Sequence, residues 1–214
     1  MARPILLGLG ANVGDAEATL AAAVDLLGDV VSVEDVSSVY ATPPWPGPGD
    51  PRHVPQDDYL NLVVRASGGP GPEAVLDAAL ELEALLGRDR AHEVRWGPRP
   101  IDVDLLLHGD EVRDTPRLTL PHPRIAERAF VLVPALEVWP GGSLPDGRRF
   151  ADLLAALSPV EGIDLVGRLT EVPTTRIPRP DGPAAPPAGF VRPGLERVAR
   201  EHGADGRPHD GGPA

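Results

Sequence analysis

Residues 87–109 read GRDRAHEVRWGPRPIDVDLLLHG, in which Asp102 and Asp104 alternate with aliphatic residues. This alternation predicts a β-strand over 101–107, because successive side chains of a strand point to opposite faces of a sheet. The two aspartates then share one face, and the aliphatic side chains pack behind them. We therefore expect a sheet with one polar and one apolar face at this point of the chain.

Four arginines, Arg88, Arg90, Arg95 and Arg99, precede the two aspartates. Neighbouring carboxylates repel each other unless a cation lies between them, and Mg²⁺ is often held by one or two carboxylates together with substrate phosphates. The guanidinium group also matches phosphate oxygens. An Asp-x-Asp strand could instead be the polar outer face of a half-exposed sheet, with the arginines as solvated counter-charges. The four arginines and the Trp-Gly-Pro turn before the strand favour a metal and nucleotide-phosphate site.

The composition limits the classes of protein that the chain can belong to. With 214 residues and 42% hydrophobic residues, it forms one domain, or one domain with an appendage. It contains no apolar run of eighteen residues and no signal peptide, so we expect a cytoplasmic protein. The absence of cysteine and lysine excludes disulfides, thiol nucleophiles and Schiff-base chemistry. The net charge of −12 argues against general nucleic-acid binding. Residues 88–128 carry eight arginines against eight acidic residues, so an anionic ligand would be directed there.

Hydrophobic periodicity predicts the order of the elements. We expect strands at 4–9, 30–40, 59–64 and 101–107, and helices at 16–28, 72–86, 125–136 and 150–157. Six prolines between positions 43 and 55 place a stiff loop outside the sheet. This order fits an α+β ferredoxin-like α/β sandwich with a mainly antiparallel central sheet. We assign residues 1–160 to this domain and expect the Pro/Gly-rich extension, 161–214, to be largely disordered.

Three features remain ambiguous from the residues alone. The glycines Gly8, Gly10 and Gly14 fit a tight strand-to-helix turn better than a phosphate-binding loop. Asn61, on an otherwise apolar strand, could pair with the edge of a heterocycle or bond a loop. His122, by itself, is better explained as a turn histidine that the backbone satisfies.

Several short motifs occur together in a family-specific order. They are LGANVGD (9–15), SVYATPP (38–44), DYLN (58–61), RWGPR (95–99) with DVD (102–104), and LPHPR (120–124) followed by ERAF (127–130). With these motifs the chain resembles the 6-hydroxymethyl-7,8-dihydropterin pyrophosphokinase family over residues 4–157. The resemblance implies transfer of pyrophosphate from ATP to the pterin hydroxymethyl group, giving AMP, in folate biosynthesis.

The resemblance also implies a role for each matched residue. Asp102 and Asp104 would hold two Mg²⁺ ions, and Arg88 and Arg99 would clamp the phosphates and complete the catalytic set. The implied pterin-binding residues are Thr42, Pro43, Tyr59, Asn61, Trp96 and Phe130. The implied ATP-binding residues are Glu83, Arg88, Arg90, Arg95, Arg99, Ile101, Leu105, Arg117, Thr119, His122 and Arg128. ATP and the pterin would be the partners of a monomer that binds neither nucleic acid nor membrane.

The chain departs from the family pattern at three places. The loop from Pro44 to Tyr59 is several residues longer and carries Trp45 in place of a smaller aliphatic residue. The segment from Arg90 to Arg95 is about one residue longer, and Pro100 precedes the aspartate strand.

Two other functions can be weighed against a kinase. A dinucleotide-dependent oxidoreductase would use the N-terminal glycine turn and requires a doubly wound parallel sheet. A non-catalytic ferredoxin-like module would bind ATP or a pterin without turnover.

Overall fold

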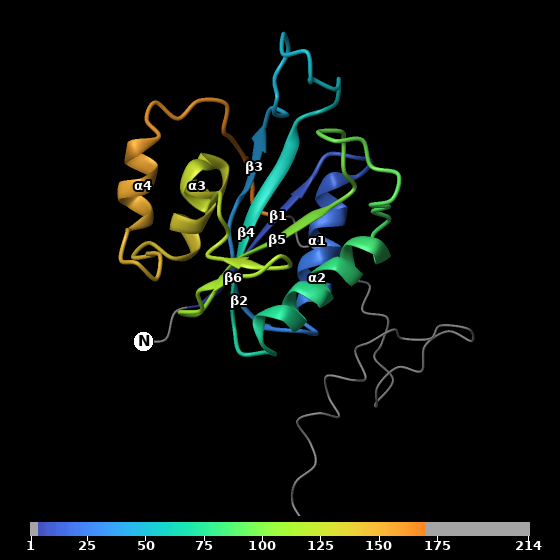
Figure 1. The fold of residues 1–214 in the computed structure, drawn as a ribbon. Helices are drawn as coiled ribbons and strands as arrows, with labels where there is room; N and C mark the ends of the chain where they lie inside the picture. The colour runs from blue at the N-terminus through green and yellow to red at the C-terminus, as the bar shows by residue number, and fades with distance from the viewer. Residues whose placement is uncertain (1–3, 170–214) are drawn as a thin grey trace, which may run out of the picture. The chain divides into compact units, whose positions relative to one another are not determined.

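The chain folds as an α/β sandwich, with helices on both faces of a main β-sheet (Figure 1). The computed structural model describes residues 4–169. The strands are β1 (Ile5–Ala11), β2 (Ser32–Val36), β3 (Val39–Thr42), β4 (Tyr59–Ser67), β5 (Asp102–His108), β6 (Arg113–Asp114), β7 (Thr119–Leu120) and β8 (Asp164–Gly167). The helices are α1 (Ala16–Leu27), α2 (Pro72–Leu85), the 3₁₀ turn η1 (Ile125–Glu127), α3 (Ala129–Val138) and α4 (Phe150–Ala156).

The main sheet has the strand order β5-β1-β4-β3-β8, and β2 pairs with the C-terminal part of β4, residues 64–67. Every one of these pairings is antiparallel. The predicted α+β sandwich with an antiparallel sheet is thereby confirmed. The oxidoreductase alternative is wrong, because it requires a parallel, doubly wound sheet.

The sheet separates two layers of helices, α1 and α2 on one face and α3 and α4 on the other (Figure 1). Alternating residues of each strand supply the two cores. In β1, Leu7 and Leu9 pack in the core that α1 and α2 cover, whereas Leu6 packs in the core under α3 and α4. In β5, Val103 and Leu105 face α1 and α2, which leaves the aspartate side to the α3 layer.

Local sequence signals explain the helix ends on the α1 and α2 side. The Asp15 carboxylate caps α1 by accepting a hydrogen bond from the Ala18 N–H at 3.0 Å. Gly14 adopts a φ of 65°, which confirms the tight turn between β1 and α1. The helix predicted at 72–86 is also confirmed as α2, and its residues Val75, Ala79 and Leu82 are buried.

Residues 30–40, predicted as one strand, form two. Ser37 and Ser38 interrupt it: the Ser37 hydroxyl accepts from the Val63 N–H at 2.9 Å, and the Ser38 N–H and hydroxyl both donate to Glu137 of α3 at 2.9 Å. Side-chain hydrogen bonds of this kind compete with the strand ladder. The break therefore ties β3 to α3.

The predicted helix 125–136 is also divided. Arg128 has an extended backbone (φ −116°, ψ 98°) between η1 and α3. This kink gives α3 a separate start at Ala129, one residue before Phe130.

The C-terminal strand β8 was not expected from the sequence. It pairs with β3 and lies beyond the domain end that we placed at residue 160. The sheet therefore includes at least residues 164–167. The rest of the expected extension, from residue 170, lies outside the described residues.

Between residues 4 and 169, the helices are too short or too polar to span a bilayer.

Candidate active site

Two glycines of β1 leave room above the centre of the sheet. Gly10 pairs with Asn61 of β4 and with Asp102 of β5, and Gly8 pairs with Asp104 in the next row. A Cβ atom at Gly10 would lie 3.0 Å from the Asn61 Oδ1. Directly opposed residues of an antiparallel pair project to the same face. The amide and the two carboxylates therefore share one face.

This face is the floor of a cavity of about 790 Å³. Its walls come from the proline loop (residues 43–58, between β3 and β4), the arginine loop (residues 86–101, between α2 and β5) and the start of α3. Ten of the predicted site residues line it, namely Thr42, Pro43, Tyr59, Asn61, Trp96, Arg99, Asp102, Asp104, Arg128 and Phe130. Residues that are distant in sequence thus form one cavity with aromatic, amide, cationic and anionic groups.

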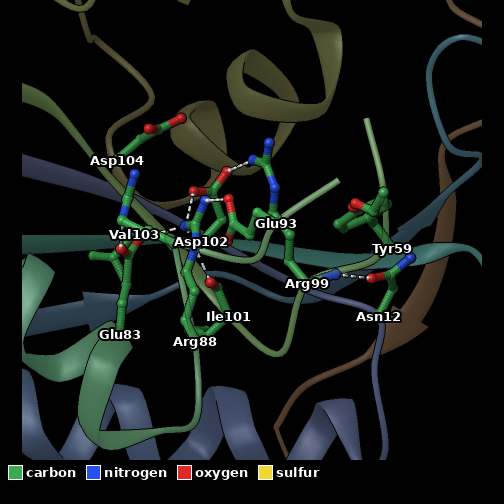
Figure 2. A network of polar contacts seen from close by, with 12 residues as sticks. Asn12, Tyr59, Glu83, Arg88, Glu93, Arg99, Ile101, Asp102, Val103 and Asp104 are labelled. Atoms are coloured by element: carbon green, nitrogen blue, oxygen red, sulfur yellow. Dashed lines mark hydrogen bonds and ion pairs between the residues drawn. The ribbon is translucent and has the colours of Figure 1, made fainter. Parts of the chain in front are cut away.

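Asp102 lies in a network of arginines and carboxylates (Figure 2). Arg88 Nη1 donates to Asp102 Oδ1 at 2.5 Å, and Arg99 Nη1 donates to Oδ2 at 2.8 Å. Burial raises the pKa of Asp102, but the positive charges of Arg99 and Arg88 outweigh burial and hold this pKa below its ordinary value. The carboxylate is therefore charged at neutral pH, as metal binding requires.

Arg88 is the most buried cation of the network, with 2% of its side chain exposed. Its Nη1 also donates to Glu83 Oε1 at 2.7 Å and to the Ile101 carbonyl at 3.2 Å, while Nε and Nη2 contact the Glu93 carboxylate. Burial lowers the pKa of Arg88, but the surrounding carboxylates outweigh burial and raise it. Arg88 therefore stays charged despite its burial.

Glu83 joins the last turns of α2 to β5. Its Oε1 accepts from the Val103 N–H at 2.8 Å, and its Oε2 pairs with Arg90 at 2.5 Å. Burial raises the pKa of Glu83, and the Val103 N–H and the arginines oppose this shift. Glu83 is 1% exposed and lies beneath the Asp102 cluster, outside the cavity lining.

Asp104 has a separate set of neighbours, an arginine and a histidine. Arg128 Nη1 donates to Asp104 Oδ2 at 3.0 Å, and His122 Nε2 lies 3.8 Å from the same oxygen. Burial lowers the pKa of His122 although Asp104 opposes this shift. The Arg128 guanidinium also lies 5.5 Å from the centre of the Phe130 ring. The kink before α3 thus places a cation and an aromatic ring beside the second aspartate.

Asn12 connects the two loops that border the cavity. Its Oδ1 accepts from the Arg99 N–H at 2.8 Å, and its own N–H donates to the Arg99 carbonyl at 3.1 Å. Its Nδ2 donates to Gln56 Oε1 at 2.9 Å and to the Asp57 carbonyl at 3.0 Å. The end of β1 therefore holds the arginine loop and the proline loop together.

Direct contacts between the two loops complete this junction. Gln56 Nε2 donates to the Trp96 carbonyl at 2.7 Å, and the Tyr59 hydroxyl donates to the Gly97 carbonyl at 2.9 Å. The Trp45 and Trp96 rings meet edge to face, with centroids 4.8 Å apart. Trp45, noted from sequence only as a departure from the family pattern, lines the cavity with 62% of its surface exposed.

The other predicted ATP-binding residues lie outside this cavity lining. Ile101 and Leu105 are core residues, 0% and 3% exposed, and the Leu105 side chain packs on the α1 and α2 side. Arg117 pairs with Asp77 of α2, and Thr119 belongs to the β6–β7 hairpin. The remaining predicted ATP-binding residues outside the cavity lining are Glu83, Arg88, Arg90, Arg95 and His122. Nucleotide contacts by these residues stay predictions.

The sequence analysis assigned no role to Asn12 and Gln56, which join the two loops, and it did not place Gly8 and Gly10 opposite the aspartates. Asn12 stood in a quoted motif, but its partners are 44 and 87 positions away. Glu93 carried one weak signal, an acid inside an arginine-rich loop. Gly8 and Gly10 alternate along β1, which would have predicted an open face had the strand been placed at the sheet centre.

Comparison with known proteins places this geometry in a family. The family model described as 7,8-dihydro-6-hydroxymethylpterin-pyrophosphokinase (HPPK) matches residues 6–140. A Methylorubrum extorquens protein named 2-amino-4-hydroxy-6-hydroxymethyldihydropteridine pyrophosphokinase is 44% identical over 163 residues, which cover 75% of this chain and 96% of the relative. The Pseudomonas aeruginosa protein of the same name is 37% identical over 166 residues, covering 77% and 97%.

A solved structure agrees on the fold. The Plasmodium falciparum HPPK-DHPS crystal structure superposes with a TM-score of 0.54 at 13% identity, covering 73% of this chain and 45% of that chain. The match spans less than half of that longer protein, and at this identity it bears on the fold alone. On the family model and the two relatives, this chain belongs to the 7,8-dihydro-6-hydroxymethylpterin-pyrophosphokinase (HPPK) family.

Proposed function

We propose that this chain transfers the pyrophosphoryl group of ATP to the hydroxymethyl group of 6-hydroxymethyl-7,8-dihydropterin, giving AMP and the pterin diphosphate for folate biosynthesis. One observation carries the proposal. A single cavity is lined by Tyr59, Asn61 and Phe130, which would form a slot for a flat heterocycle, and by the carboxylates Asp102 and Asp104. A kinase for a pterin needs both parts within reach of each other.

The donor set fits Mg²⁺. Asp102 and Asp104 supply hard oxygens on one face of β5, and among residues 4–169 no group of three or more metal-binding side chains occurs. Mg²⁺ characteristically binds through one or two carboxylates and takes its other ligands from phosphates and water. We propose two Mg²⁺ ions at these aspartates. When bound, they would neutralise the triphosphate and polarise the β-phosphoryl oxygens.

The arginines would bind and orient the triphosphate. Arg99 lines the cavity, and its buried Nε has no hydrogen-bond partner among residues 4–169. Arg128 reaches Asp104 from the opposite wall. Guanidinium groups stabilise the charge that spreads over phosphoryl oxygens during transfer. We assign Arg88 and Arg99 to the catalytic set, and Arg90, Arg95 and Arg128 to ATP binding.

The heterocycle slot would orient the attacking hydroxyl group. Tyr59 and Phe130 offer aromatic surfaces, and Asn61, whose Nδ2 donates to Thr42 Oγ1 at 2.8 Å, is held where its amide can read a ring edge. The pterin oxygen then bonds the β-phosphorus, the bond from this phosphorus to the α–β bridging oxygen breaks, and AMP leaves. The hydroxyl proton is released, and no side-chain nucleophile is needed.

One assay tests the function. The protein is incubated with ATP, Mg²⁺ and 6-hydroxymethyl-7,8-dihydropterin, and AMP and pterin diphosphate are quantified. We expect both products in equal amounts, and no AMP when the pterin is omitted. Tight binding of both ligands without AMP would instead support a non-catalytic binding module.

A further inference from the structure

All three guanidinium nitrogens of Arg88 donate hydrogen bonds to protein groups. Nη1 bonds Glu83, the Ile101 carbonyl and Asp102, while Nε and Nη2 bond Glu93 (Figure 2). A guanidinium has five N–H donors in a fixed plane, so it cannot add a bidentate partner without losing one. A phosphate that binds Arg88 through two N–H groups must therefore replace one of these four partners.

Three of the four partners are held in place by regular structure. Glu83 belongs to α2, is 1% exposed and is anchored by the Val103 N–H and Arg90. Asp102 belongs to β5, and the Ile101 carbonyl is backbone that immediately precedes it. Displacing any of these groups would disturb α2 or the sheet.

Glu93 is the partner that can leave. It lies in the arginine loop, between α2 and β5, and 23% of its side chain is exposed. Its Oε2 lies 3.2 Å from Arg88 Nη2, and Arg88 is the hydrogen-bond partner found for it among residues 4–169. The Arg88 hydrogen bonds are the main reason why the pKa of Glu93 is lowered, so the carboxylate remains anionic at neutral pH.

We propose that Glu93 is a built-in competitor of the nucleotide phosphates: its carboxylate occupies the Nε/Nη2 edge of Arg88, and triphosphate binding displaces it. The inference rests on the proposed function, in which Arg88 binds ATP phosphate. Carboxylate and phosphate are the two groups that match this edge of a guanidinium. Displacement also frees the loop that carries Trp96, three residues further on, so nucleotide binding and loop position become linked.

The local charge supports this exchange. The cluster contains three cations, Arg88, Arg90 and Arg99, and three carboxylates, Glu83, Glu93 and Asp102. With Glu93 in place the charges cancel, and with Glu93 displaced one positive charge remains uncompensated for an anionic ligand. Glu93 therefore lowers nucleotide affinity by competing for Arg88, and it assists release of the product nucleotide.

The test measures binding of Mg²⁺ with an ATP analogue that has a methylene group between its α and β phosphorus atoms, by isothermal titration calorimetry. We expect Glu93→Gln to bind the analogue about fivefold more tightly than the wild type, the scale of a partly exposed ion pair. A variant that merely loses structure would bind more weakly, so a gain in affinity separates competition from a structural role. Glu93→Ala is the second variant, should Glu93→Gln fail to fold.

The matched control is Asp89→Asn, which removes one negative charge from the same loop. Asp89 pairs with His92 at 2.7 Å and lies outside the cavity lining. We expect its affinity to stay near the wild-type value. Unchanged or weaker binding by both Glu93 variants, or an equal gain in Asp89→Asn, overturns the inference. Wild-type protein that binds no analogue and forms no AMP contradicts the proposed function instead.

Discussion

Single residues of this site act through their charge and their immediate partners. Asp102 and Asp104 are neighbours on one strand face, yet Arg88 and Arg99 hold the first while Arg128 and His122 flank the second. Each carboxylate therefore has at least one arginine partner before any ligand is considered. The arginine partners explain how two like charges coexist on adjacent rows of the sheet.

We predict that Asp102→Asn and Asp104→Asn each lower kcat by at least about 100-fold, which is about 2.7 kcal/mol of transition-state stabilisation. Removal of a carboxylate charge weakens Mg²⁺ binding where the phosphoryl group reacts. Steady-state kinetics would measure the loss, and urea unfolding would check that each variant is folded. Activity near that of the wild type in either variant would remove that residue from the metal site.

The lowered pKa of Glu93 predicts that the free energy of unfolding depends on pH. Its folded pKa is lowered from the ordinary value of 4.5, chiefly by the Arg88 hydrogen bonds. The folded chain thus binds the Glu93 proton more weakly than the unfolded chain. The stability that the charged Glu93 carboxylate contributes is therefore present above pH 4.5 and is lost as the pH falls through the folded pKa. Urea unfolding between about pH 6 and pH 3 should show a shallower loss of stability in Glu93→Gln than in the wild type. Parallel curves would contradict the lowered pKa.

At the scale of elements, the site depends on two loops that meet over the end of the sheet. The longer proline loop brings Trp45 against Trp96 of the arginine loop, while Asn12 and Gln56 bond across the same junction. Ring pairs of this kind contribute about 0.5–1.5 kcal/mol beyond their burial. The two loops are therefore expected to respond together when the cavity is filled.

A double-mutant cycle tests this coupling. We predict that Trp45→Ala and Trp96→Ala each raise the Kd of the pterin and that their effects are not additive, with a coupling energy of about 1 kcal/mol. Trp139→Phe is the control, because Trp139 packs on Phe150 and does not line the cavity. Strictly additive effects would show that the loops act independently.

At the scale of the whole molecule, the sheet is completed by a strand from beyond the expected domain end. Before β8 pairs with β3, the chain passes the cavity, and Glu161, Gly162 and Ile163 contribute to its lining. Gly162 has a φ of 68°, and a Cβ atom there would lie 3.3 Å from Pro43 Cδ. The C-terminal part of the domain thus supports the wall that the proline loop forms.

Two truncations separate the domain from the extension. We predict that a chain ending at Leu169 keeps wild-type kcat and KM, because every described element remains. A chain ending at Leu157 should lose stability and raise the KM of the pterin, because β8 and the segment beside Pro43 are removed. Urea unfolding and steady-state kinetics would measure both, and a fully active chain ending at Leu157 would contradict a role for β8.

The sequence by itself determined the elements whose signals are local. The two-residue period placed Asp102 and Asp104 on one face, and the helical period identified α1 and α2, because both patterns follow from the geometry of the element alone. The breaks at Ser38 and Arg128 escaped this reasoning, since their side-chain partners, Glu137 and Asp104, are distant in sequence.

Only the tertiary structure decided which groups meet. It joined Asn12 to Arg99, 87 positions away, aligned Gly8 and Gly10 with the aspartates, and set Glu93 on the buried edge of Arg88. These contacts depend on strand register and on loop closure, which no short stretch of sequence encodes. The aspartate strand of residues 101–107 therefore indicated the chemistry of the site, whereas the packing of loops around it formed the cavity and positioned the Glu93 carboxylate.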